Sequence, residues 1–265
     1  MHIDVEYLIA TTNRSDLKFL QKMNITDPAI VMNQNGRNEV LSAGKNVMFS
    51  TSTRGVGVNR NIALNLAKAE YGFIVDDDMV FYDGINNLME RALKKYPDAD
   101  VIIFNFDYVK DDKFVRPRMK KTGAINITNC LHYGICCALV KMSSIRKENI
   151  SFSTLFGGGC VYSCGEDSLF FLECVRKGLK IYTYQEPVGR NEYRESSWFK
   201  GYNEKFFYDK GAWIACAFPH LKHLVKWYFV VRLGRLSDMH FRGVIREINQ
   251  GIKGYDKIVA YSKES

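Results

Sequence analysis

Residues 58–78 read VNRNIALNLAKAEYGFIVDDD, a helical pattern that runs into a short apolar segment and then into three aspartates. Asn59 predicts the start of the helix, whose apolar stripe consists of Ile62, Leu66 and Ala69. The segment YGFIV at 71–75 predicts a buried strand. The pattern therefore indicates a helix that leads into a strand with an acidic end.

Asp76, Asp77 and Asp78 repel one another, and the apolar residues beside them disfavour their charged forms. A divalent cation would relieve this repulsion, because it binds carboxylate oxygens and cancels their charge. Magnesium and manganese bound in this way keep some waters and also bind substrate phosphates. We therefore expect Mn²⁺ or Mg²⁺ at Asp76 and Asp78. The alternative is a solvated turn, in which aspartate is common.

Strand and helix patterns alternate through the first half of the chain. We expect strands at 6–10, 29–32, 46–50, 71–75 and 100–106, and helices that begin at Asp16, Asn59 and Asp83. Such alternation predicts an α/β fold with a mostly parallel sheet and flanking helices. In the second half we expect strands at 132–140 and 179–184, a helix at 168–177 and helices after about residue 205.

A second acidic pair, Glu166 and Asp167, precedes the predicted helix at 168–177. Helix capping alone would explain one acid there, because acids suit the positive end of a helix. The preceding loop, FGGGCVYSCGED at 156–167, carries several glycines. Glycines let the backbone approach a bulky polar ligand closely, so Gly157, Gly158 and Gly159 are predicted to form an acceptor loop.

Three motifs, in order, resemble those of the family 2 glycosyltransferases. ATTNR at 10–14 stands where the family's first strand ends, VNRNIALNLAKAEYGFIVDDD resembles its R-N…D-x-D stretch, and GED at 165–167 resembles its later E-D motif. The resemblance covers roughly residues 5–195. It implies a GT-A type, Rossmann-like sheet, and an inverting, hexosyltransferase-like enzyme that uses a nucleotide-sugar donor.

The resemblance also implies roles for individual residues. Asp78 would be the principal metal ligand and Asp167 the catalytic base, with Glu166 beside it orienting sugar or acceptor hydroxyls. The nucleotide and its sugar would contact a further set of residues: Thr11, Asn13, Arg60, Asp76 and Asp77.

Two departures from the family pattern change the donor site. The stretch MNQNGRNE at 32–39 lacks the family's base-reading aspartate, so Asn33 or Asn35 would take that role. No histidine lies between residues 133 and 219 to serve as a further metal ligand. Arg190 or Arg194 would instead contact the diphosphate directly.

The net charge of +8 and a pI near 9.0 favour anionic partners. Two other functions are therefore open: a nucleotidyltransferase on a similar sheet, and a basic nucleic-acid-binding protein. The first lacks a Gly-rich, basic signature near the first strand, and the second leaves both acidic motifs unexplained. If the protein is a glycosyltransferase, we expect no nucleic-acid partner.

Seven cysteines, an odd number without any C-x-x-C pair, favour reduced thiols in the cytoplasm. We expect no signal peptide, because the N-terminus lacks a basic region, and no transmembrane helix, because charges interrupt every long apolar run.

The C-terminal segment FPHLKHLVKWYFVVRLGRL at 218–236 mixes cations with aromatic and aliphatic residues. Such a composition is typical of an amphipathic helix on an anionic membrane surface, which would make the protein peripheral on the inner face of the membrane. The alternative is a helix that packs on the sheet. We predict a nucleotide-sugar-binding half at 1–110, an acceptor-binding half for a saccharide or lipid-linked acceptor at 111–205, and a helical extension at 206–265.

Overall fold

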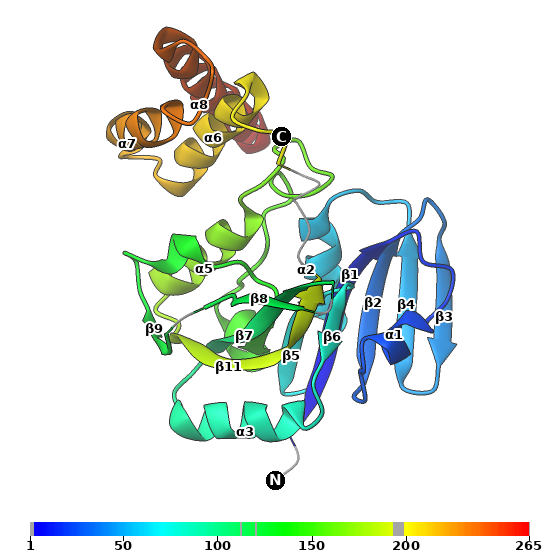
Figure 1. Cartoon of the computed structure of the whole chain (residues 1–265). Coiled ribbons are helices and arrows are strands. Elements are labelled where there is room, and N and C mark those ends of the chain that lie inside the picture. Colours follow the sequence, from blue (N-terminus) through cyan, green and yellow to red (C-terminus); the bar gives the residue numbers. More distant parts are fainter. Residues whose placement is uncertain (1–2, 112, 120, 193–198, 265) are drawn as a thin grey trace. The chain divides into compact units, whose positions relative to one another are not determined.

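The chain folds into two compact units, shown in Figure 1. The computed structural model describes residues 3–111, 113–119, 121–192 and 199–264. Unit 1 comprises Met1–Thr154 and Glu166–Glu195, and unit 2 comprises Leu155–Gly165 and Ser196–Ser265. Unit 1 contains the sheet and unit 2 contains three long helices.

One half of the sheet is parallel and follows the predicted strands. Its order is β4 (Asn46–Thr51), β2 (Ala29–Gln34), β1 (Val5–Thr12) and β5 (Tyr71–Asp76), all hydrogen-bonded in parallel. The apolar runs of β1, β2 and β5 are buried, as expected for strands covered on both faces. At the edge, β3 (Glu39–Ala43) pairs antiparallel with β4. Every residue of β3 is exposed, so no apolar pattern predicted it.

The other half contains antiparallel pairs, so the sheet is mixed rather than purely parallel. Strand β10 (Ala138–Lys141) runs antiparallel between β5 and β7 (Val101–Lys110). No α-helix separates β7 from β10 among the described residues, and a parallel neighbour usually needs such a crossover. Strand β11 (Ile181–Glu192) then lies parallel to β7.

Three short strands complete the sheet and have no counterpart among the predicted strands. Strand β6 (Met79–Phe81) follows the three aspartates and pairs antiparallel with β11. Strand β8 (Lys113–Pro117) forms a hairpin with β7, and β9 (Gly123–Ile125) pairs with β11. Each is only three to five residues long, too short for a reliable alternating pattern.

The helices of unit 1 are α1 (Phe19–Lys22), α2 (Val56–Leu66), α3 (Ile85–Lys95), α4 (Met142–Lys147) and α5 (Glu166–Arg176), with a 3₁₀ turn at Cys130–His132. Helix α2 begins three residues before the predicted start, after Gly55 at φ 111°, which favours glycine. Asn59 is therefore inside the helix and buried rather than at its cap. Helix α5 also starts early, so Glu166 and Asp167 belong to its first turn.

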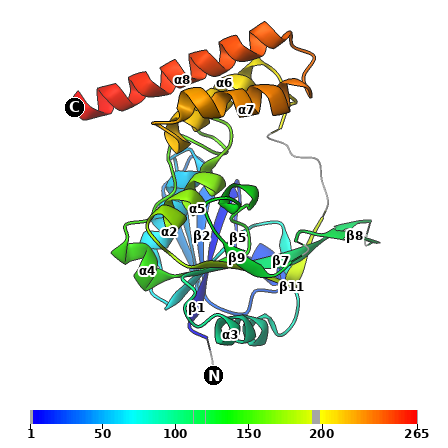
Figure 2. The same ribbon diagram turned by 90° about the vertical axis from the view of Figure 1, so that its left-hand side faces the viewer.

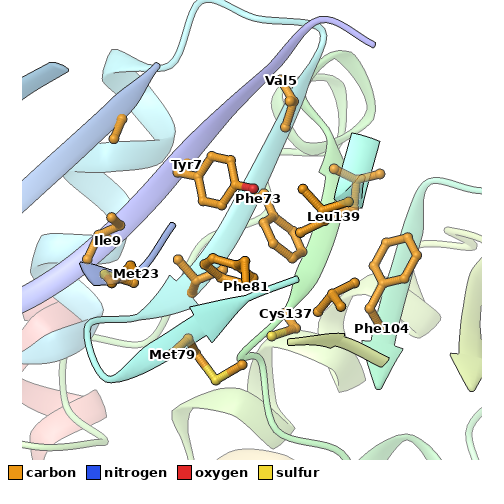
Figure 3. Packing of buried hydrophobic residues seen from close by; sticks show 14 of the residues in the cluster. Val5, Tyr7, Ile9, Met23, Phe73, Met79, Phe81, Phe104, Cys137 and Leu139 are labelled. Atoms are coloured by element: carbon orange, nitrogen blue, oxygen red, sulfur yellow. The ribbon is translucent and has the colours of Figure 1, made fainter. Parts of the chain in front are cut away.

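Aromatic residues of β1, β5, β6 and β7 form the core of unit 1, as Figure 3 shows. The Tyr7 ring meets the rings of Phe73 and Phe81 edge-on at 5.3 Å, and Phe104 approaches Phe73 at 6.2 Å. Residues of α1 and α3 pack into the same cluster. This packing holds β5 and β6 on either side of the aspartates, and the turn that carries Asp77 and Asp78 is therefore anchored at both ends.

Unit 2 is built around α6 (Glu204–Ala217), α7 (Lys222–Gly234) and α8 (Phe241–Glu264). Figure 2 shows α7 and α8 along their lengths. The helices predicted after residue 205 are thus confirmed. Helices α6 and α8 approach closely because glycines face the neighbouring backbone. A Cβ on Gly211 would lie 2.1 Å from the Ile248 carbonyl oxygen, and one on Gly251 would lie 1.9 Å from that of Tyr208. Within the part of the chain that the structure describes, no helix combines the length and apolar character needed to cross a bilayer.

Candidate active site

The carboxyl ends of three parallel strands meet at one edge of the sheet. In the register, Thr11 of β1 lies beside Asn33 of β2, and Ala10 lies beside Asp76 of β5. Asp76 ends β5, and Asp77 and Asp78 form the turn into β6. Ligands of open α/β sheets bind at such an edge.

Arg60 joins the two acidic motifs. Its side chain, 9% exposed, donates from Nη2 to Asp76 at 3.2 Å and from Nη1 to Asp167 at 2.9 Å and Glu166 at 3.4 Å. The guanidinium also lies over the Phe152 ring, 5.3 Å from its centroid. Burial works against the charge of Arg60, but the three carboxylates raise its pKa above the ordinary value. In the structure Arg60 holds three acidic side chains in place, and its predicted contact with the nucleotide stays a prediction.

The acids of α5 differ in their surroundings. Burial, together with the charge of Asp167, raises the pKa of Glu166 to about 7, and Arg60 opposes that rise. Asp167 is more exposed, 31% against 14% for Glu166. Besides its bond with Arg60, Asp167 accepts a hydrogen bond from the Ile135 backbone N–H at 3.1 Å. The two carboxyls therefore offer one group that protonates near neutral pH and one that is held by two donors.

Asp77 binds the end of β1 and the loop that follows it. Its Oδ2 accepts hydrogen bonds from the Thr11 hydroxyl and from Arg14 Nη2, the latter at 2.7 Å. The Arg14 guanidinium also lies over the Phe19 ring, 4.7 Å from its centroid. Thr11 is buried and Asn13 is exposed at φ 57° beside this cluster. The predicted residues Thr11 and Asp77 are thus brought together, and Arg14 joins them.

Asn33 supports the same loop from β2. Its side-chain oxygen accepts from the Arg14 backbone N–H at 3.0 Å, and its amide donates to the Arg14 carbonyl at 2.8 Å and to Ser50 at 3.1 Å. Asn33 is fully buried and is hydrogen-bonded to this loop, and its predicted contact with the base stays a prediction. Asn35 donates to Ser50 at 3.2 Å and accepts from the Arg37 N–H.

Asp78 contacts β11 through Asn191, whose amide donates to Asp78 Oδ1 at 2.8 Å. Asp78 is exposed, yet protein packed around its carboxyl raises its pKa, as does the charge of Asp76, while Asn191 lowers it. Arg190, the preceding residue on β11, lies near Tyr82, where its charge opposes the raised pKa of the phenol. Neighbouring strand residues point to opposite faces, so Arg190 and Asn191 face different sides of β11. The other predicted arginine, Arg194, lies outside the described residues.

The residues present fit a divalent cation whose coordination is completed by the substrate. Among the described side chains, no group of three His, Cys, Asp or Glu residues is arranged to hold a metal ion. Asp76 and Asp78 nevertheless bracket the turn, and each has a carboxylate oxygen hydrogen-bonded to a protein donor. Magnesium in phosphate-binding sites is commonly held by one or two carboxylates together with substrate phosphates. Two aspartates on one turn match such a donor set, and a bound cation at this turn stays a prediction.

The sequence model of Glycosyl transferase family 2 matches residues 37–152, a range that includes Arg60 and the three aspartates. The predicted resemblance is thus confirmed for this part of the chain. The match supports a glycosyltransferase over the nucleotidyltransferase and nucleic-acid-binding alternatives.

Solved structures similar to this chain include S. aureus TarS 1–349 with UDP-GlcNAc, at a TM-score of 0.57 and 14% identity, over 94% of this chain and 72% of that chain. The same TarS fragment with UDP matches at a TM-score of 0.55 and 14% identity, over 94% of this chain and 71% of that chain. A further S. aureus TarS structure matches at 0.55 and 12%, over 94% of this chain and 43% of that chain. These likenesses confirm the GT-A type α/β fold. No curated protein matches the sequence significantly.

Two residues of the candidate site, Arg14 and Arg118, carried no sequence signal strong enough to predict them. Arg14 binds Asp77, as described above. Arg118 donates to the carbonyls of Gly134 and Cys136 and lies over the Phe106 ring at 5.1 Å. A Cβ on Gly134 would lie 3.1 Å from Arg118 and 3.2 Å from Asp167, so both side chains flank this glycine. Arg118 belongs to a stretch rich in cations, KFVRPRMKK at 113–121, so nothing in the sequence singled it out.

The predicted acceptor glycines Gly157, Gly158 and Gly159 belong to unit 2. Within that unit the loop is held at Ser163, whose backbone N–H and hydroxyl both donate to the buried carboxylate of Asp209, at 3.0 and 2.6 Å. The role of these glycines toward an acceptor stays a prediction.

A cavity of 360 Å³ in unit 1 is remote from this chemistry. It is lined by residues at the start of β1 and just before β2, among them Asp4, Asp27 and Lys45. Parallel strands place their starts and ends at opposite edges of the sheet, so this cavity lies across the sheet from Asp76. The candidate active site is therefore located by the geometry of the acidic residues and does not coincide with the cavity.

Proposed function

We propose that the chain transfers a sugar from a nucleotide-diphosphate donor, a UDP-sugar, to a hydroxyl of a saccharide or lipid-linked acceptor, with inversion at the anomeric carbon. The family match supports the transferase class. The similar TarS structures contain UDP-GlcNAc and UDP, which supports a uridine nucleotide as the donor carrier.

One observation carries the proposal. Arg60 brings Asp76, at the end of β5, into the same hydrogen-bonded group as Glu166 and Asp167, at the start of α5. A donor bound at Asp76 would therefore have its reacting carbon near a carboxylate able to take a proton. If the acids only capped α5, no arginine would need to reach both the end of β5 and the start of α5.

Asp167 is the proposed general base. The acceptor oxygen forms its bond to the anomeric carbon while the bond from that carbon to the diphosphate breaks, and the hydroxyl proton moves to Asp167. Hydrogen bonds from Arg60 and Ile135 hold both oxygens of Asp167, and each oxygen has a second lone pair for the proton. Glu166, which lies largely buried beside it, would orient the sugar or acceptor hydroxyls.

Asp76 and Asp78 would hold Mn²⁺ or Mg²⁺, with Asn191 fixing the orientation of Asp78. Such a cation, when bound, neutralises the leaving diphosphate. Arg14 and Arg190 are the cations of the described chain that we propose for the diphosphate, and Arg194 stays a further candidate. Asn35 and Asn13 are proposed to contact the base and ribose.

A donor-hydrolysis screen tests the proposal. The full chain is incubated with UDP-, GDP- and dTDP-sugars, with and without Mn²⁺, and release of the nucleoside diphosphate is measured. Release from one UDP-sugar, increased by Mn²⁺ and lost in Asp167→Asn, is expected. Release of pyrophosphate from a nucleoside triphosphate and sugar phosphate would instead indicate a nucleotidyltransferase and overturn the proposal.

A further inference from the structure

Helix α7 exposes an apolar stripe at helical spacing. Leu224, Trp227, Tyr228 and Val231 stand at positions i, i+3, i+4 and i+7 and are 71%, 46%, 53% and 46% exposed. The opposite side of α7 packs within unit 2: Val230 is 1% exposed, and the Phe229 ring meets that of Trp213 at 5.7 Å. Unit 2 therefore covers one face of α7 and leaves a second apolar face uncovered.

The charged side chains of α7 itself have one sign. Residues 218–237 contain four Lys and Arg and no Asp or Glu. Lys222 and Lys226 are used inside unit 2, where they bind Asp256 at 2.7 Å and Asn249 at 2.9 Å. Arg232 and Arg235 are exposed beside the stripe, and Arg232 donates to the Tyr228 hydroxyl and lies over its ring. The exposed face of α7 thus combines aliphatic and aromatic side chains with two arginines.

We propose that this face of α7 binds an anionic lipid bilayer, with the helix axis parallel to the membrane plane. Leu224 and Val231 would enter the acyl region, while Trp227 and Tyr228 would occupy the headgroup level that aromatic residues prefer. The arginines would contact lipid phosphates. At 13 residues, α7 is shorter than the roughly 20 residues that a bilayer span requires.

Two other occupants fit the face less well. A symmetric contact with a second copy of the chain would bring Arg232 and Arg235 of both copies together without any acidic partner on α7. The phosphates of a nucleic acid would bind the arginines, but they would leave the aliphatic residues Leu224 and Val231 exposed to water. The proposal does not depend on the transferase chemistry of unit 1.

Vesicle co-sedimentation of the full chain tests the proposal, with phosphatidylcholine vesicles compared to vesicles that contain phosphatidylglycerol. Binding should require the anionic lipid and weaken with salt, since charges are screened over about 10 Å at 0.1 M ionic strength. The variant Arg232→Gln/Arg235→Gln should bind about 30-fold more weakly, since each cation near the surface contributes about 1 kcal/mol.

The matched control is Lys253→Gln/Lys257→Gln, which removes two exposed cations of α8 and causes the same change in net charge. It should keep most of the binding, and equal losses in both double variants would overturn the assignment to α7. Melting curves of both variants, compared with wild type, report folding. Leu224→Ser/Val231→Ser tests the apolar contribution, and unchanged binding in that variant would also contradict the proposal.

Tryptophan fluorescence gives an independent measurement. Brominated anionic lipids should quench part of the emission of the wild-type chain, and Trp227→Phe should abolish that quenching while sedimentation with vesicles persists. Quenching that survives in Trp227→Phe would place another segment in the membrane. Binding to an oligonucleotide that is lost in the arginine variant, without vesicle binding, would assign the face to nucleic acid. A dimer that disappears in Leu224→Ser/Val231→Ser would assign it to a second copy.

Discussion

Arg60 on α2 and Asp167 on α5 are separated by 107 residues in the chain, yet Nη1 of the arginine lies 2.9 Å from Oδ1 of the aspartate. The same guanidinium reaches Asp76, so the end of the fifth strand and the start of the fifth helix share one buried cation. An arginine suits this position because its planar guanidinium presents several donors in fixed directions and keeps its charge when buried. The arrangement makes the stability of the fold and the geometry of the acids depend on one side chain.

Arg60→Ala is expected to lower the free energy of unfolding and to abolish transfer. The loss should be about 3 kcal/mol, at the low end for removing one partner of a buried ion pair, because Asp76 and Asp167 are 46% and 31% exposed. The control is Arg91→Ala, whose exposed pair with Glu186 should contribute less than about 1 kcal/mol. Urea unfolding measures both, and equal losses would contradict the role of Arg60.

Asp167→Asn should reduce transfer by roughly 10²–10⁴-fold, because asparagine cannot take the proton from the acceptor. Donor binding should remain, since the base faces the acceptor. Some stability will also be lost, because the new amide N–H₂ must face Arg60 or the Ile135 N–H, both of which are donors. Turnover, donor affinity and a melting curve separate these effects. Near-wild-type turnover in Asp167→Asn, with inactivity in Glu166→Gln, would move the base to Glu166.

The raised pKa of Glu166 predicts a pH dependence of stability. With a pKa of about 7 in the folded chain and an ordinary value of 4.5, Glu166 keeps a proton on folding that the unfolded chain releases. Its contribution is therefore fully present below pH 4.5 and is lost as pH rises through about 7, by at most about 3 kcal/mol. Glu166→Gln removes this dependence. Unfolding in urea between pH 5 and 8 should show the two proteins diverging, and parallel curves would sink the prediction.

Asp78→Ala should abolish Mn²⁺-dependent UDP binding while the fold survives. Asn191→Ala should weaken that binding by about 10–100-fold, the usual effect of removing a group that orients a ligand of a metal. Calorimetric titration with UDP and Mn²⁺ measures both. Asp98→Ala, which removes the exposed aspartate that pairs with Tyr182, is the matched control and should bind normally. Unchanged Mn²⁺-dependent affinity in Asp78→Ala would remove the metal assignment.

Asp77→Ala separates the second aspartate from the metal. Because Asp77 binds Thr11 and Arg14, its loss should loosen Arg14 and weaken UDP binding without abolishing the effect of Mn²⁺. Arg14→Ala should weaken UDP binding to a similar extent, and the double variant should lose little more. Fully additive losses in this cycle would mean that the two side chains act independently.

Local patterns in the sequence determined the parallel half of the sheet, helix α3 and the two acidic motifs. In each case the signal was short-range: an apolar run, an amphipathic spacing, or acids directly after a strand. The family 2 resemblance of the stretch that ends at Asp78 rests on the same local order of residues. These features could be predicted because the residues that define them are neighbours in the chain.

Only the tertiary structure decided which partners those residues have. The roles of Arg60, Arg14 and Asn191 depend on contacts across 107, 63 and 113 residues, which a single sequence does not encode in any local spacing. The antiparallel insertion of β10 likewise follows from the missing crossover and not from its own residues. The sequence by itself therefore determined where the acids lie along the chain, and long-range packing decided which cation holds each of them, because burial makes an unpaired charge too costly to keep.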